Sequence, residues 1–218
     1  MNATENPAIC PLCRAPANAA PISLRTGSYH SCENCDLVFR APDEWLDAAA
    51  ERAYYLTHRN DIHDPGYRHF LSQLADPFIE RLPPGARGLD YGSGQAPALA
   101  AMLRERGFDV AVHDPFFAPD DSALQRQYGF ITCTEVLEHM HHPDRELERL
   151  DGMLKAGGCL GVMTELRPAP ERFADWHYHR DPTHVCFYSA ETMRWIARRH
   201  QWQVEIIGKR VALFVKRG

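Results

Sequence analysis

The chain has 218 residues, of which 44% are hydrophobic and 24% charged, a balance typical of a globular protein with one catalytic domain and a small additional module. Its net charge of -5 disfavours a protein that holds nucleic acid by bulk positive charge. No apolar run approaches the length of a transmembrane helix, and the N-terminus resembles no secretory signal, so we expect a cytoplasmic enzyme.

Two closely spaced cysteine pairs stand within the first forty residues. Cys10 and Cys13 form one C-x2-C pair, and Cys32 and Cys35 form the other. This arrangement is typical of a zinc ribbon, in which two tight turns present four thiolates to one ion. Because four protein ligands leave no open coordination position, we expect structural zinc and a ribbon over residues 1–40. The alternative is two unrelated surface turns, while disulfides are disfavoured without a secretion signal. The other three cysteines are expected to be small buried hydrophobic side chains: Cys133, Cys159 and Cys186.

Residues 41–85 are expected to form a helical segment that acts as a lid or linker. The apolar residues that recur there at helical spacing are Trp45, Leu46, Ala49, Ala53, Leu56, Phe70, Leu71, Leu74, Phe78 and Ile79. Tyr54 and Tyr55 would either cover a ligand or pack in the core. The run Leu82–Gly85 then ends the helical pattern.

From residue 86 onward, strand-like and helix-like segments alternate. The expected strands are 86–91, 108–113, 130–134, 159–164, 203–207 and 211–216, and the expected helices are 96–106, 144–154 and 189–200. Lys155–Gly158 is expected to end the second of these helices. The pattern predicts an α/β fold with a Rossmann-like, mostly parallel sheet, helices on both faces and a C-terminal antiparallel hairpin.

A strand that ends in Asp90 is followed by a glycine turn, with Gly92 and Gly94, and then by a helix. Glycines there let a bound ligand approach the backbone closely, at the carboxyl ends of the strands where such sheets bind ligands. Asp114 ends the next strand, where a carboxylate can accept hydrogen bonds from both hydroxyls of a ribose. A dinucleotide would also suit this pattern, but Ala96-Pro97 stands where a pyrophosphate cradle needs its third glycine.

Two further segments, residues 130–139 and 150–158, complete the pattern. With them, the chain resembles the class I S-adenosylmethionine-dependent methyltransferases over about residues 86–218. It also resembles their bacterial subset with an N-terminal zinc ribbon, and the group that includes quinol-biosynthesis O-methyltransferases. The resemblance implies S-adenosylmethionine as the cofactor. The residues that it places beside the cofactor are Asp90, Gly92 and Gly94 at the methionine part, Asp114 at the ribose, and Thr134 and Glu135 beside the methyl group.

The chain departs from this family pattern after Asp114. Residues 115–129 alone separate it from the next strand, so the edge strand that the family usually inserts there is expected to be missing. The acidic residue that reads adenine near that strand then has no counterpart. Two aromatic residues would either stack on adenine or pack under the loop, and two carboxylates are candidates for a polar contact. These adenine-side candidates are Phe116, Phe117, Asp120 and Asp121.

Glu135, Glu138 and His139 have the spacing i, i+3, i+4, so a helical turn would place them on one face. His184 lies in the segment 176–189, which the resemblance places at the acceptor pocket. Two carboxylates and two imidazoles suit a divalent cation such as Mg²⁺, Mn²⁺, Fe²⁺ or Zn²⁺, which would lower the pKa of an acceptor hydroxyl. The motif resembles the metal site of small-RNA 3′-terminal 2′-O-methyltransferases and the Glu-x-x-Glu-His motif of the quinol enzymes.

An alternative interpretation of these residues needs no metal. Glu138 and His139 would then hold a loop, and His139 or His184 would act as the general base. His141 and His142 are expected to be solvated loop residues. The residues expected to contact the acceptor are Trp176, Tyr178 and Asp181.

The sequence therefore predicts a methyltransferase, and O-methylation of a small hydroxylated acceptor is the favoured reaction. An RNA methyltransferase is one alternative, because seven lysines and arginines after residue 193 oppose only Glu205. The same charges would also suit a solvated helix face. The other alternative is a non-catalytic cofactor-binding module, which would have no use for the glutamate and histidine group.

Overall fold

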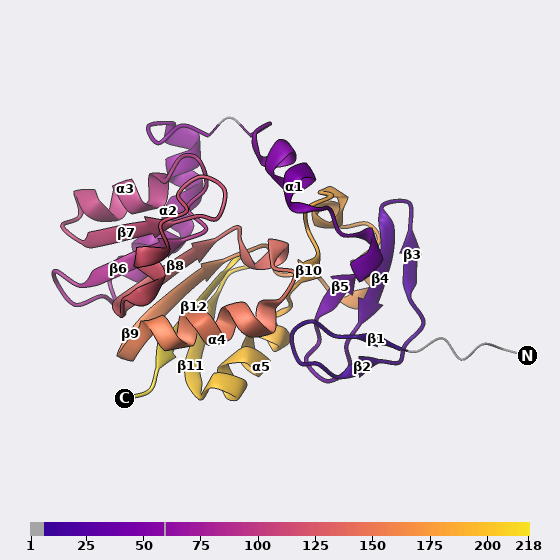
Figure 1. Ribbon diagram of the computed structural model, residues 1–218. Helices are drawn as coiled ribbons and strands as arrows, with labels where there is room; N and C mark the ends of the chain where they lie inside the picture. The colour runs from indigo at the N-terminus through magenta and orange to yellow at the C-terminus, as the bar shows by residue number, and fades with distance from the viewer. Residues whose placement is uncertain (1–6, 59) are drawn as a thin grey trace, which may run out of the picture.

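The computed structural model describes residues 7–58 and 60–218 and contains a large sheet with strand order β11-β12-β9-β8-β6-β7 (Figure 1). The neighbours β7, β6, β8 and β9 run parallel, whereas β12 pairs antiparallel with both β9 and β11. The mostly parallel sheet with a C-terminal hairpin is confirmed. Its strands are β6 (Arg87–Tyr91), β7 (Asp109–His113), β8 (Tyr128–Thr134), β9 (Leu154–Met163), β11 (Trp202–Ile207) and β12 (Val211–Lys216).

Helices pack on both faces of this sheet (Figure 1). The first face carries α2 (Pro65–Ile79) and α3 (Ala98–Glu105), whose apolar side chains pack on Phe130 of β8. The other face carries α4 (Pro143–Met153) and α5 (Ala190–His200), which pack on the opposite side of the same strands. None of the helices in the described part of the chain has the length and hydropathy that a membrane crossing requires.

The loop after β7 contains no further strand of the large sheet, in a segment that is described throughout. A single bridge pairs Asp114 with Ala118, and a 3-10 turn spans Asp121–Gln125. β7 is therefore the edge of the sheet, as the short spacing predicted. The helix α4 ends at Met153, just before the residues expected to end it, and Lys155–Gly158 already belong to β9, which starts directly after α4.

The N-terminal region forms two small sheets. β1 (Ala8–Ile9) pairs with β2 (Pro16–Ala17), and the second sheet has the order β10-β5-β4-β3. The strands of this second sheet are β3 (Ile22–Leu24), β4 (Gly27–Ser31), β5 (Val38–Arg40) and β10 (Cys186–Phe187). β10 comes from the far end of the chain, so the cysteine-bearing region shares a sheet with the segment that follows His184.

The helix α1 (Ala48–Tyr55) faces the opposite way from the expectation. Its spacing predicted that Ala49, Ala53 and Leu56 would be buried, but all three are exposed, whereas Glu51 is only 8% exposed. Alanine buries little apolar area, and the face of α1 that packs on the rest of the protein is the one with Tyr55, whose ring contacts Phe116 and His139, so that Leu56 is left exposed.

Candidate active site

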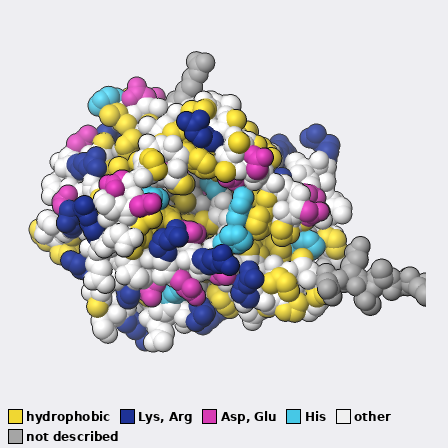
Figure 2. Space-filling model, viewed as in Figure 1, with side chains coloured by type: hydrophobic (Ala, Val, Ile, Leu, Met, Phe, Trp, Pro, Cys, Tyr) yellow, Lys and Arg dark blue, Asp and Glu magenta, His cyan; other side chains and the backbone are white. Residues whose placement is uncertain are grey.

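A cavity of about 610 Å³ opens at the carboxyl ends of β6, β7 and β8. Figure 2 shows histidine side chains beside a hollow in the middle of the viewed face. The predicted site residues that line the cavity are Gly92, Gly94, Asp114, Phe116, Thr134, Glu135, His139, Asp181 and His184. The predicted site residues that lie outside its lining are Asp90, Glu138, Trp176 and Tyr178.

The glycine turn after β6 is tied to the end of β7. Asp114 accepts a hydrogen bond from the Gly94 N–H at 2.9 Å through one oxygen, and from two N–H groups of the next loop through the other. Gly92 has a φ of +73°, and a Cβ there would lie 2.4 Å from Cγ2 of Val136, so the turn requires glycine. The turn and the carboxylate form a fixed cradle that lets a nucleoside lie close to the backbone, as S-adenosylmethionine requires.

The loop after β7 turns its aromatic residues into the cavity. Phe116 and Phe117 both line it, and their N–H groups donate to Oδ1 of Asp114 at 2.9 and 3.0 Å. The Phe116 ring lies 5.7 Å from that of Tyr55 on α1, so an apolar wall faces the expected adenine position. The two carboxylates considered for a polar contact lie outside the cavity lining: Asp120 and Asp121.

Asp90 lies beneath the glycine turn. It is 3% exposed and accepts a hydrogen bond from Oγ1 of Thr132 at 2.8 Å. Burial raises the pKa of its carboxyl to about 6. Asp90 therefore lies outside the cavity lining, where its carboxyl links β6 to Thr132 of β8.

Two glutamates after β8 share one phenol. Glu135 follows the strand with a φ of +52°, and Glu138 lies in a 3-10 turn. The Tyr178 hydroxyl lies 3.0 Å from Oε2 of Glu135 and also contacts Oε1 of Glu138. A phenol carries a single hydrogen, so one of the two carboxyls must be protonated for both contacts to be hydrogen bonds. Consistent with this, burial and the neighbouring Glu138 raise the pKa of Glu135 to about 8, and burial raises that of Glu138 to about 7.

Both predicted histidines are oriented by backbone carbonyls. Nδ1 of His139 lies 3.1 Å from the Thr183 oxygen, and Nδ1 of His184 lies 2.7 Å from the Tyr178 oxygen. A carbonyl only accepts, so each ring carries its hydrogen on Nδ1 and its lone pair on Nε2. Burial lowers the pKa of His139, and burial together with the neighbouring His139 lowers that of His184 to about 3, so both rings are neutral at physiological pH.

These histidines and Glu138 are close enough to share an ion. One ligand atom from each of the three residues lies within 4.8 Å of the others. Glu135 is not part of this group, in which the ligand atoms of Glu138, His139 and His184 meet the distance limit among the described residues. Oε2 of Glu138 is buried without a hydrogen-bond partner, so it is free to bind a cation. Of the four predicted metal ligands, three therefore lie close enough to bind one ion, and the fourth, Glu135, lies beside them.

The two aromatic residues expected to line the acceptor pocket lie behind it. Tyr178 is buried under the two glutamates, and Trp176 packs on Phe173 and Phe187. Nε1 of Trp176 donates to Oε1 of Glu165 at 2.7 Å. The expectation that these rings line the cavity is wrong, because the hydroxyl of Tyr178 supports Glu135 and Glu138 from below.

In the metal-free protein, Glu135 and Glu138 are expected to make the free energy of unfolding fall as the pH rises from about 5 to about 8, while the buried neutral histidines act in the opposite direction below about pH 6.5. Glutamate titrates near pH 4.3 when unfolded, so in this range the folded state binds more protons at Glu135 and Glu138, and stability is lost as they dissociate. The free energy of unfolding is measured with urea at several pH values. Glu138→Gln should make its slope against pH less negative by up to about 1.4 kcal/mol per pH unit. The exposed control Glu205→Gln should keep the slope. A slope that Glu138→Gln leaves unchanged would contradict the assignment.

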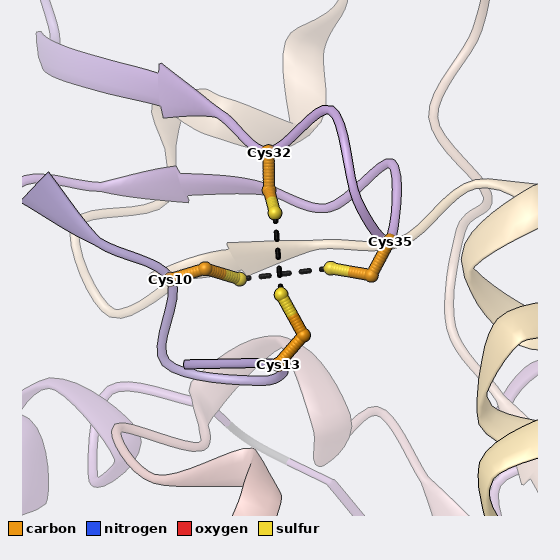
Figure 3. A group of neighbouring side chains, drawn as sticks. All are labelled: Cys10, Cys13, Cys32 and Cys35. Atoms are coloured by element: carbon orange, nitrogen blue, oxygen red, sulfur yellow. Dashed lines mark hydrogen bonds between the residues drawn. The ribbon is translucent and has the colours of Figure 1, made fainter. Parts of the chain in front are cut away.

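The four predicted cysteines point toward one another and form a second site (Figure 3), and none of them lines the cavity. Their sulfurs all lie within 4.8 Å of one another, with 3.6 Å between Cys10 and Cys35 and 3.3 Å between Cys13 and Cys32. Zn–S bonds of about 2.3 Å in a tetrahedron place sulfurs ~3.8 Å apart, so the donor set fits zinc. The hydrogen bond with Cys35 lowers the pKa of Cys10 to about 6, whereas burial raises that of Cys32 to about 12. A bound cation would let the buried Cys32 join Cys10 as a thiolate.

The cavity is also lined by residues that were not predicted for it, among them Glu51, Tyr67 and His141. His141, expected in solvent, and Glu51 face it together, and Tyr67 of α2 lines it from another side. The sequence carries no local signal for Glu51, because its burial depends on how α1 lies over the sheet. Tyr67 was recognisable only as part of the helical pattern of residues 41–85.

The sequence and the fold are similar to those of known methyltransferases. A family described as a methyltransferase domain matches residues 66–206. No match is found among curated proteins. The fold is similar to that of 1,6-didemethyltoxoflavin-N1-methyltransferase from Burkholderia thailandensis, solved with 1,6-didemethyltoxoflavin and S-adenosylhomocysteine, at 15% identity and a TM-score of 0.56, over 92% of this chain and 100% of that chain.

Two further solved structures share the fold. A SAM-dependent methyltransferase from Archaeoglobus fulgidus is 14% identical with a TM-score of 0.54, over 68% of this chain and 94% of that chain. An O-methyltransferase family 2 protein from Planctomyces limnophilus, in complex with apigenin, is 15% identical with a TM-score of 0.50, over 78% of this chain and 62% of that chain.

Proposed function

This chain belongs to the S-adenosylmethionine-dependent methyltransferases, and we propose that it methylates a hydroxyl oxygen of a small acceptor with the help of a divalent metal ion. The observation that carries the proposal is the group formed by Glu138, His139 and His184. Two of the three residues line the cavity next to Thr134 and Glu135, where the methyl group is expected. One carboxylate and two neutral imidazoles together suit a divalent transition metal ion such as Mn²⁺, Fe²⁺ or Zn²⁺.

The protonation of the histidines favours a metal over histidine as the general base. A general base works best when its pKa lies near the ambient pH, but burial and the neighbouring His139 lower the pKa of His184 to about 3. Metal binding instead requires the neutral ring with a free Nε2, which the Nδ1 hydrogen bonds of His139 and His184 provide. When bound, the ion would lower the pKa of an acceptor hydroxyl.

Glu135 is the residue that we assign to proton removal. It lines the cavity, and its Oε1 is buried without a hydrogen-bond partner. Burial and the neighbouring Glu138 raise its pKa to about 8, within the range that a general base uses near neutral pH. In the reaction the acceptor oxygen bonds to the methyl carbon as the carbon–sulfur bond breaks, S-adenosylhomocysteine leaves, and the hydroxyl proton passes to Glu135.

The four cysteines are assigned a structural zinc ion as the second part of the proposal. Their closed four-sulfur geometry supports a role in folding rather than in the reaction. The basic C-terminal run does not favour RNA as the acceptor, because Arg194 and Arg198 of α5 are paired with Glu191, as on a solvated helix face.

The test measures cofactor and metal binding in the same zinc-loaded protein. We expect S-adenosylhomocysteine to bind in calorimetry, and Mn²⁺ to bind at one site whose electron paramagnetic resonance spectrum shows nitrogen ligands. Glu138→Gln should remove this Mn²⁺ signal while S-adenosylhomocysteine affinity stays within about 3-fold. The control Glu205→Gln should change neither.

The other possible outcomes would each contradict a different part of the proposal. Mn²⁺ binding that survives Glu138→Gln, or that is absent in the wild type, would remove the metal and leave Glu135 as the base. Absence of S-adenosylhomocysteine binding would overturn the cofactor assignment.

A further inference from the structure

Glu51 is the buried residue of a helix whose alanines face solvent. Its side chain is 11% exposed and lines the cavity, whereas Ala48, Ala49 and Ala50 beside it are exposed. Its Oε1 is buried and has no hydrogen-bond partner. Burying a carboxylate removes its hydration, so a glutamate is rarely buried without a partner. The cofactor cradle and the glutamate and histidine group described above do not use this side chain.

Glu51 is held from the side by His141, which in turn stacks on Trp45. Nε2 of His141 lies 3.0 Å from Oε1 of Glu51 without an aligned hydrogen bond, and this nitrogen is also buried without a partner. The Trp45 ring stacks on His141 with centroids 4.5 Å apart, and its Nε1 donates to the Arg40 oxygen at 3.1 Å. We call Trp45, Glu51 and His141 the polar corner of the cavity.

The polar corner lies on the acceptor side of the cavity. Tyr55 is one turn after Glu51 on α1, and its ring packs edge-on against His139 with centroids 5.4 Å apart. Side chains one helical turn apart are separated by about 6 Å. A ligand whose reacting hydroxyl lies at His139 can therefore reach Glu51 with a second group a few atoms away.

We propose that Glu51, oriented by His141, binds a second polar group of the acceptor, an ammonium in preference to a hydroxyl. A carboxylate oxygen only accepts hydrogen bonds, so the group that it binds must be a donor. An ammonium forms the stronger bond because it is charge-assisted. The inference rests on the proposed function, since it takes the His139 side of the cavity as the place of the reacting hydroxyl.

Three probes with the same pair of phenolic hydroxyls test the charge at this position. Dopamine carries an ammonium, 4-methylcatechol is neutral, and 3,4-dihydroxyphenylacetate carries a carboxylate. Each is titrated into the zinc-loaded protein saturated with S-adenosylhomocysteine. We expect dopamine to bind at least about 10-fold more tightly than the acid, and Glu51→Gln to reduce this ratio at least about 5-fold. His141→Gln should reduce it in part, and Glu205→Gln should leave it unchanged.

Several outcomes would overturn the inference. One is a ratio that Glu51→Gln leaves unchanged while its melting temperature and its S-adenosylhomocysteine affinity match the wild type. Another is the absence of binding by all three probes at millimolar concentration. A loss of S-adenosylhomocysteine affinity in Glu51→Gln would place Glu51 in the cofactor site instead. Failure of the proposed function is seen separately, as wild-type protein that does not bind S-adenosylhomocysteine at all.

Discussion

Replacing Asp114 with alanine is expected to weaken S-adenosylhomocysteine binding at least about 100-fold, which corresponds to ~3 kcal/mol. Two losses combine in this variant. The carboxylate that would bind the two ribose hydroxyls is gone, and each hydrogen bond to a charged group contributes about 1.5–3 kcal/mol. In addition, Gly94, Phe116 and Phe117 lose the acceptor of their N–H groups, so the cradle itself loosens. Calorimetric titration measures the effect.

Asp109→Ala is the matched control for this prediction. Asp109 begins the strand that Asp114 follows, but its side chain is 67% exposed and is paired with Arg87 on the surface. The control should bind S-adenosylhomocysteine like the wild type. An Asp114→Ala protein that keeps its affinity within about 3-fold would show that the cofactor does not lie on this carboxylate.

Replacing Cys35 with serine is expected to release the zinc. It should also lower the melting temperature by more than Asp114→Ala, Glu138→Gln or Glu51→Gln does. Structural zinc contributes about 10–16 kcal/mol of apparent binding free energy in small metal-dependent folds. The loss should also reach the acceptor side of the cavity. Arg40 of β5 donates from its backbone N–H to the Val185 oxygen, and the Val185 N–H donates to the Glu138 oxygen. The sheet that flanks the second cysteine pair therefore supports the segment that carries His184.

Elemental analysis and hydrogen exchange measure the two parts of this effect. We expect Cys35→Ser to lose its zinc and to exchange faster over residues 177–187, while S-adenosylhomocysteine still binds. Cys159→Ser changes a cysteine of β9 outside the four-sulfur group and should keep one zinc ion. Retention of a full equivalent of zinc in Cys35→Ser would contradict the assignment of this residue as a ligand.

Local patterns were sufficient to predict the large sheet. Apolar runs, glycine turns and the short spacing after Asp114 are properties of neighbouring residues, and they predicted the mostly parallel sheet with its C-terminal hairpin. The cysteine site could also be predicted from the sequence, because the spacing within each cysteine pair reflects the geometry of one bound ion. The glutamate and histidine motif predicted three residues that do meet, Glu138, His139 and His184.

The remaining features depend on contacts between distant segments. Tyr178 was expected in the cavity wall, yet its hydroxyl lies between two glutamates that stand about forty positions earlier. The predicted orientation of α1 was wrong for the same reason. Glu51 is buried in the polar corner, and His141, which contributes to that corner, comes from a distant segment of the chain. Helical spacing describes which side chains share a face, but not which neighbour that face meets.

The pairing of β5 with β10 has a consequence for how the molecule is made. Val38 leaves the ribosome early, whereas its partner Phe187 is synthesised after most of the methyltransferase domain. The nascent ribbon can gather its four cysteines as soon as residue 35 emerges, but its sheet keeps an open edge until β10 arrives. Closing that edge brings together segments far apart in sequence, the kind of contact that slows folding. A hybrid enzyme given another ribbon would therefore need a matching β10.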